Sequence, residues 1–142
     1  MDRCDFSSIM TYLKNQISES NQMSQPEFLY EIFEDFLESP ENKEFTLDNG
    51  LVCRWMTGQA KISPKISSFY AKPSNQEKLA KNIHQNILPL TADYSRTLQD
   101  IYTLFIQDSS ISEAKKAELA SLYKPADLRL LFLAKLISFG ME

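Results

Sequence analysis

The segment from residue 24 to residue 40 reads SQPEFLYEIFEDFLESP and sets the pattern for much of the chain. Its apolar side chains recur in pairs every four residues, while carboxylates fill most of the other positions, which is typical of an amphipathic α-helix. Ser24 and Glu27 have the spacing of a capping box, and Ser39 before Pro40 is pushed out of the helical conformation. We therefore predict one helix over residues 24–39 with one buried face.

The same helical spacing of apolar residues continues through most of the 142 residues. Further helix starts are indicated at Ser63-Pro64, at residues 74–77 (SNQE) and at residues 110–113 (SISE). Gly58 is placed to end a short helix that begins near Asp48. No pair of strand-like runs joined by a turn motif is present in the sequence. We predict an all-α fold, a single compact domain over residues 1–142 with about seven short helices packed orthogonally.

Charge is distributed unevenly along the sequence. The whole chain has 15 Lys and Arg residues against 19 Asp and Glu residues, a net charge of −4, which is not the basic balance of a typical nucleic-acid-binding domain. Residues 1–50 carry eleven acids and three bases, a net charge of −8, whereas residues 51–100 carry three acids and seven bases, a net charge of +4. This division indicates either two surfaces with different partners or two solvated faces without partners.

No pattern in the sequence points to catalysis or to a bound cofactor. The single histidine, His84, has no cysteine or carboxylate at ligand spacing, and the three glycines form no phosphate-binding loop. Cys4 and Cys53 lack the spacing of a zinc site, and Cys53 beside Val52 is expected to be a buried thiol. We expect a non-enzymatic protein without cofactor, metal or small-molecule substrate. An enzyme whose site only the fold assembles stays open as a further alternative.

The beginning of the sequence carries no recognisable targeting signal. Residues 1–5 contain no basic region followed by an apolar stretch. No apolar run reaches the roughly 18 residues that a membrane-spanning helix needs. Two isolated cysteines fit a reducing compartment. The sequence therefore predicts a cytoplasmic protein that does not bind membranes.

A basic segment follows the acidic helix and reads RWMTGQAKISPKI over residues 54–66. It is similar to the end of the recognition helix and the following turn in Cro- and phage-repressor-type helix-turn-helix proteins. The resemblance implies that residues 49–81 bind DNA, with basic side chains on the phosphates. The sequence departs from that pattern at residues 40–47, where a charged stretch replaces a short turn. The candidate nucleic-acid-binding residues are Arg54, Lys61, Lys65 and Lys72.

The alternative interpretation of this basic segment is purely structural. In it, Trp55 anchors the core, Gly58 ends a helix and the lysines form a solvated rim. A wider resemblance covers residues 24–70, where LDNG at residues 47–50 leads into Arg54 and Trp55. This stretch looks like a helical domain common in uncharacterised proteins of Gram-positive bacteria, which we associate with mobile elements and phage-conflict loci. The resemblance implies no catalytic residues and no biochemical role.

Two functional hypotheses follow from these patterns. In the first, the chain is a non-enzymatic interaction protein of bacterial or mobile-element origin that binds a protein or nucleoprotein partner stoichiometrically through an acidic helix face. If the partner is a bacterial nuclease complex, the protein is an anti-CRISPR-type inhibitor. In the second, it is a helix-turn-helix transcriptional regulator that binds DNA. The acidic residues could also only keep the protein soluble. The candidate protein-interface residues are Glu31, Glu34, Asp35 and Glu38.

Overall fold

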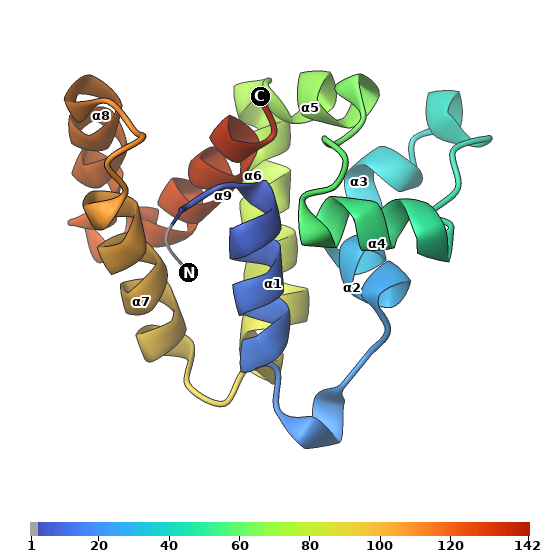
Figure 1. Ribbon diagram of the computed structural model, residues 1–142, viewed down its shortest axis with the longest axis horizontal. Coiled ribbons are helices and arrows are strands. Elements are labelled where there is room, and N and C mark those ends of the chain that lie inside the picture. The colour runs from blue at the N-terminus through green and yellow to red at the C-terminus, as the bar shows by residue number, and fades with distance from the viewer. Residues whose placement is uncertain (1–2) are drawn as a thin grey trace.

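A computed structural model describes residues 3–142 (Figure 1). Within these residues the chain forms nine α-helices in one compact domain and no β-strand, which confirms the predicted all-α class but exceeds the expected seven helices. A π-helical segment, Ile83–Ile87, continues α6. The helices are α1 (Phe6–Gln16), α2 (Gln25–Ile32), α3 (Glu34–Leu37), α4 (Asn49–Thr57), α5 (Pro64–Tyr70), α6 (Pro73–Asn82), α7 (Tyr94–Gln107), α8 (Glu113–Tyr123) and α9 (Arg129–Gly140).

The helices surround one shared hydrophobic core. Figure 1 shows α1 and α6 in the middle of the molecule, with α7, α8 and α9 on one side and α2 to α5 on the other. Helix α9 is apolar nearly all round and packs against α6, α8 and α1, which buries side chains on several of its faces. No helix in residues 3–142 is both long enough and apolar enough to span a membrane.

The predicted helix over residues 24–39 is divided in two. Phe33 leaves the helical conformation, with φ −98° and ψ 22°, and separates α2 from α3. The ring of Phe33 packs 6.1 Å from Phe6 and 5.5 Å from Tyr70, whereas Phe36 meets Phe45 at 5.2 Å and Phe69 at 5.6 Å. The break therefore lets two aromatic side chains of one segment reach two different sets of rings, and tertiary packing overrides helix propensity.

Helix caps agree with the sequence in some places and differ in others. Ser24 accepts from the Glu27 N–H at 3.2 Å, and Gly58 ends α4 with φ 78°, as expected. Helix α8 begins two residues later than expected, because Ser112 rather than Ser110 is its N-cap and accepts from the Lys115 N–H. Gly140 is the last helical residue of α9, and Met141 follows as the cap.

Helix α6 starts at Pro73 instead of in the predicted capping box at residues 74–77. Proline fits the first helical position because its φ is already helical and its missing N–H would be unpaired there. The side chains of Asn75 and Gln76 turn inward: Asn75 donates to the Phe69 carbonyl at 2.8 Å, and Gln76 accepts from Lys135 at 2.9 Å. These polar residues join α6 to α5 and α9 and are not available as caps.

The expectation that Cys53 is buried is wrong, whereas Cys4 is buried. Cys53 lies on the outer face of α4, since the inner face is taken by Val52 and Met56.

Near the N-terminus, Asp108 accepts from the Cys4 N–H at 2.7 Å and from the Ser110 hydroxyl at 2.6 Å. Burial and the charges of Asp108 and Asp5 raise the pKa of the Cys4 thiol to about 12. The Asp108 carboxylate thus connects Cys4 to the turn after α7 through hydrogen bonds.

The hydroxyl of Tyr70 is fully buried and has no hydrogen-bond partner within residues 3–142. Burial raises its pKa, as do the charges of Asp35 and Glu34, against the opposing influence of the Phe36 N–H. An unpaired buried hydroxyl costs about 1–3 kcal/mol. The ring itself is well packed against Phe33 and Phe69. The side chain therefore combines favourable packing with an unfavourable polar atom.

We expect Tyr70→Phe to raise the free energy of unfolding by about 1 kcal/mol, because it removes the unpaired hydroxyl and keeps the ring. Urea denaturation of both proteins at neutral pH measures the difference. A loss of stability would show instead that the Phe36 N–H hydrogen-bonds the hydroxyl in solution. Tyr94→Phe is a suitable comparison, because Tyr94 is only half-buried and its hydroxyl lies 3.2 Å from His84.

Candidate functional site

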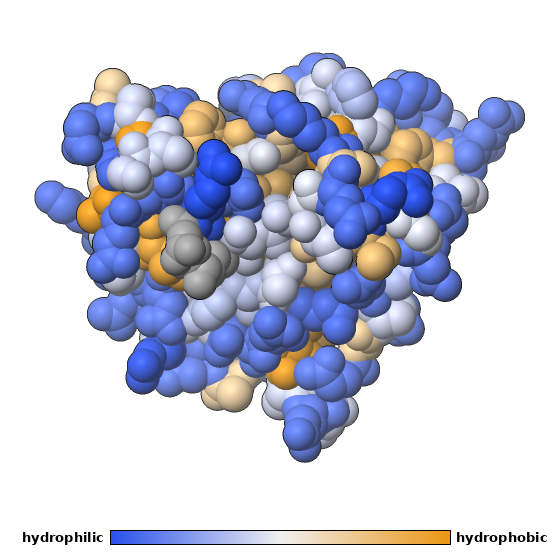
Figure 2. Space-filling view, viewed as in Figure 1, coloured by the Kyte–Doolittle hydropathy of each residue, from blue (hydrophilic) through white to orange (hydrophobic). Residues whose placement is uncertain are grey.

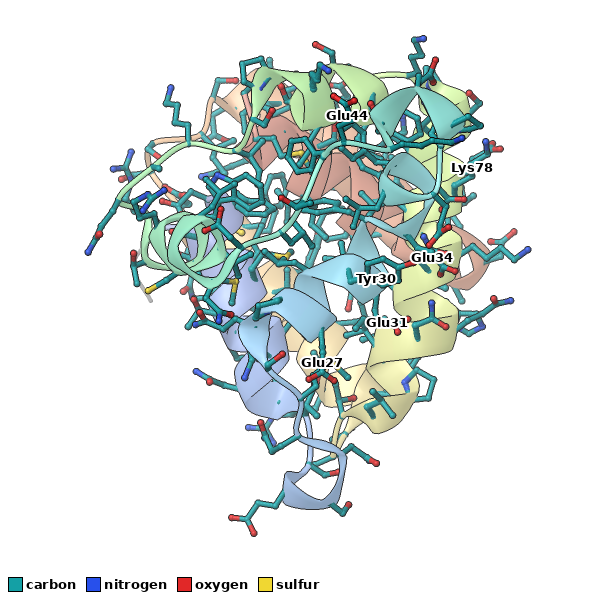
Figure 3. The ribbon with its side chains drawn as sticks, turned by 90° about the vertical axis from the view of Figure 1, so that its right-hand side faces the viewer. Glu27, Tyr30, Glu31, Glu34, Glu44 and Lys78 are labelled. Carbon is teal, nitrogen blue, oxygen red and sulfur yellow. The ribbon has the colours of Figure 1, made fainter. Side chains whose placement is uncertain are left out.

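The outer face of α2 carries an exposed tyrosine between glutamates. Glu27, Tyr30, Glu31 and Glu34 lie on the side of the molecule that faces the viewer in Figure 3. Helical spacing explains the placement of Glu27, Tyr30 and Glu31 within α2, because positions three and four residues apart share one face, and Glu34 follows at the start of α3. Tyr30 is 39% exposed, one of two large apolar side chains in residues 3–142 with this degree of exposure. The other, Ile106, lies on α7, away from the carboxylates.

The four predicted protein-interface residues do not share one degree of exposure. Glu38 is exposed, but Glu31, Glu34 and Asp35 are half-buried. The reason is the packing of α2 and α3 against α6 and its π-helical extension. Asn82 donates to the Asp35 carboxylate at 2.6 Å and Asn86 donates to Glu34 at 3.5 Å. The expected solvent-facing stripe is thus the rim of a contact between helices.

A groove of about 840 Å³ lies along this contact; we call it the α3–α6 groove. Its α3 wall carries carboxylates and its α6 wall carries ammonium and amide groups, so the two walls differ in charge. Phe69 adds an apolar surface, with its ring edge-on to Phe36. The lining residues are Glu34, Asp35, Glu38, Ser39, Glu41, Phe69, Lys78, Lys81, Asn82, Gln85 and Asn86.

The charges around the groove are not neutralised within the part of the chain that the structure describes. The salt bridges there join Arg96 to Asp100, Lys115 to Glu118 and Lys116 to Glu113, all on α7 and α8. None involves a carboxylate from residues 27–44. No three His, Cys, Asp or Glu side chains among residues 3–142 come close enough together to hold a metal ion. The acidic groups are therefore spread along a surface rather than gathered at one point.

The four predicted nucleic-acid-binding residues are all exposed but do not line one cavity. Arg54 lies on α4, whereas Lys72 precedes α6. Lys61 lines a hollow of about 300 Å³ together with Arg3. Lys65 lines a different hollow, of about 410 Å³, beside residues 40–45. The structure thus leaves these cations free for solvent or phosphate contact without gathering them in one pocket.

Helix α4 gives the basic segment only a small free surface. Val52, Trp55 and Met56 face the core, against α1 and α2. Arg54 is the one basic residue of this helix, and Gly58 ends it, so Trp55 and Gly58 have the structural roles of the alternative interpretation. A 3₁₀ turn and an extended stretch separate α4 from α3, as the charged residues 40–47 indicated.

Several features of the site cannot be recognised from the sequence pattern. Tyr30 does not stand out, because it belongs neither to the buried apolar positions nor to the acidic positions of the helical pattern. Lys78 and Lys81 follow the basic segment in sequence, whereas the structure places them across a groove from the acidic residues. Only the fold brings α6 to α3, since residues 38–72 separate them along the chain. His84 is exposed, on the π-helical continuation of α6.

The rest of the visible surface is mixed in character. Figure 2 shows a largely polar face with apolar side chains in small, separate areas rather than one continuous patch. Such a distribution is ordinary for a protein surface and does not by itself indicate a binding site.

The chain has no significant similarity to any family model, curated protein or solved structure with which it was compared.

Proposed function

We propose that this chain is a cytoplasmic, non-enzymatic protein that binds a basic surface on a protein or nucleoprotein partner stoichiometrically. The contact surface is the acidic face formed by Glu31, Glu34, Asp35 and Glu38, with Tyr30 beside it. The observation that carries the proposal is the absence, within residues 3–142, of any salt bridge to the carboxylates of residues 27–44. These charges are available to a partner.

The composition of the face supports a protein contact. Carboxylates without internal cations attract a positively charged surface and accelerate encounter with it. Exposed tyrosine is enriched at protein interfaces, because it offers a large apolar area together with a polar tip. A bacterial nucleic-acid-binding complex has a basic surface of this kind, so an anti-CRISPR-type inhibitor is one form that this function can take.

Charge reversal tests the proposal directly. Four ion pairs at the surface, at about 0.5 kcal/mol each, contribute about 2 kcal/mol, which corresponds to a roughly thirtyfold change in affinity. We expect the variant E31K/E34K/D35K/E38K to bind its partner at least that much more weakly. The wild-type protein first captures partners from a lysate of a Gram-positive bacterium, mass spectrometry identifies them, and affinity is then measured with the purified partner.

Two further variants serve as controls. E19K/E77K/D127K/E142K changes four exposed acids outside the acidic face and makes the same change in net charge. E31Q/E34Q/D35N/E38Q removes the charges but keeps oxygen acceptors for Asn82 and Asn86. The proposal requires weakening in the reversed and neutral variants and near wild-type affinity in the first control. Equal affinities in all four proteins, or capture of acidic proteins only, would contradict it.

DNA binding through residues 49–81 is a second candidate function. The observation that favours it is that Arg54, Lys61, Lys65 and Lys72 are all exposed. It predicts a mobility shift of duplex DNA at low ionic strength. Binding by R54A/K61A should depend less steeply on salt, because this variant neutralises fewer phosphates. R96A/K124A is the matched control, because it also removes one exposed arginine and one exposed lysine, but outside residues 49–81. No shift at low salt with the wild-type protein would exclude this candidate.

A further inference from the structure

The α3–α6 groove has two walls of opposite charge, and this feature goes beyond a simple acidic face. On the α3 side, Glu38 and Glu41 are exposed, next to Glu34 and Asp35. On the α6 side, the exposed ammonium groups of Lys78 and Lys81 line the same groove. No ion pair joins the two walls in the described part of the chain. Figure 3 shows Glu34 and Lys78 in the same region of the surface, on the two helices that border the groove.

Amide side chains hold these walls in place. Asn82 is 9% exposed and donates to Asp35 at 2.6 Å, while Asn86, one helical turn further on, donates to Glu34. These hydrogen bonds satisfy one carboxylate oxygen of each acid without adding positive charge. Glu34 and Asp35 are thus hydrogen-bonded to neutral amides rather than paired with cations, and Lys78 and Lys81 line the groove without an ion pair to either acid.

We infer that the α3–α6 groove binds a polypeptide segment whose cationic side chains lie along one edge and whose anionic side chains lie along the other. The cationic edge faces α3 and the anionic edge faces α6. This inference deepens the proposed function and rests on it, because it specifies the part of the partner that enters the groove. Phe69 offers an apolar surface between the two charged edges.

The lining argues against other classes of occupant. A metal ion would need carboxylates converging on one point, and no such set exists among residues 3–142. A nucleic acid strand would meet four carboxylates against two lysines, so its phosphates would be repelled. A uniformly basic peptide would gain from α3 but would meet Lys78 and Lys81 on the other side. A segment with cations opposite α3 and anions opposite α6 is attracted by both walls. A charge of the same sign as the wall that it faces is repelled.

Two fluorescently labelled synthetic peptides of equal length test this inference by fluorescence anisotropy. The amphoteric peptide has lysines on one helical edge and glutamates on the other, and the basic peptide has lysines on both edges. We expect the amphoteric peptide to bind wild-type protein about tenfold more tightly than the basic peptide, since two favourable pairs replace two like-charge pairs. K78Q/K81Q should lower the affinity for the amphoteric peptide and raise the affinity for the basic peptide.

Matched variants separate recognition from general charge effects. R96Q/K124Q removes two exposed cations outside the groove and should leave the ratio of the two affinities unchanged. Circular dichroism melts verify that each variant is folded. If the basic peptide binds the acidic face as tightly as the amphoteric one, the groove inference is wrong and the proposed function remains. If neither peptide binds, both fail. If R96Q/K124Q changes the ratio as much as K78Q/K81Q does, the inference is also overturned.

Discussion

Phe33→Ala is expected to lower the free energy of unfolding by about 3–5 kcal/mol, the range for removing a buried aromatic ring. Phe33 has no exposed surface, and its ring contacts those of Phe6 and Tyr70. It also occupies the break between α2 and α3, so its removal leaves a cavity where two helices meet α1 and α5. Urea denaturation at neutral pH gives the free energies of both proteins.

Two comparisons sharpen this first prediction. Phe33→Leu keeps most of the volume and should cost clearly less than Phe33→Ala. Tyr30 lies three residues earlier, on the exposed face of α2. Tyr30→Ala should therefore change the free energy of unfolding by no more than about 0.5 kcal/mol. A small effect of Phe33→Ala, close to that of Tyr30→Ala, would show that the break region collapses around the missing ring and that the aromatic packing contributes little.

Asp108→Ala is expected to cost about 2–3 kcal/mol at neutral pH, because it removes charge-assisted hydrogen bonds and leaves the buried Cys4 N–H unpaired. Asp108 is 5% exposed and also accepts from the N–H of Ser110 at 2.9 Å. Asp108→Asn keeps one carbonyl acceptor and should cost less. Ser110→Ala removes one hydroxyl donor but keeps the hydrogen bond with Cys4, so its effect should be the smallest of the three. Chemical denaturation ranks them.

The effect of Asp108 should depend on pH. Burial alone would raise the pKa of Asp108, but the hydrogen bonds from Cys4 and Ser110 outweigh it and lower the pKa below 3.8. A lowered folded-state pKa gives stability that is present above the unfolded value and is lost as pH falls through the folded value. The difference between wild type and Asp108→Asn should therefore be constant from pH 7 to about pH 5 and shrink below about pH 4. A difference that grows toward acid would contradict this assignment.

Much of the fold could be predicted because its signals are local. Ser24, Asp48 and Ser63 each mark a helix start through groups within three residues, and Gly58 marks an end by its own conformation. The break at Phe33 has no such signal. It depends on rings from residues 6, 45, 69 and 70, which meet only in the folded chain.

The candidate site could be predicted only in part, for the same reason. Helical periodicity identified the acidic residues of the face but treated all of them as solvent-facing. Asp35 and Glu34 are half-buried because Asn82 and Asn86 pack against them from α6 and its π-helical continuation. Periodicity within one helix cannot show which other helix lies beside it. The error at Cys53 has a similar origin, since an apolar neighbour in sequence does not share a helix face.

Trp55 gives this molecule an optical reporter of its own state. It is the single tryptophan, is 2% exposed and stacks 6.4 Å from Phe45, which in turn meets Phe36 beneath the groove. Its emission spectrum therefore distinguishes a dry indole from a hydrated one without any attached dye. The same emission reports unfolding in denaturant. It also reports any rearrangement of the rings when a peptide binds in the groove, so one chromophore serves for both folding and recognition.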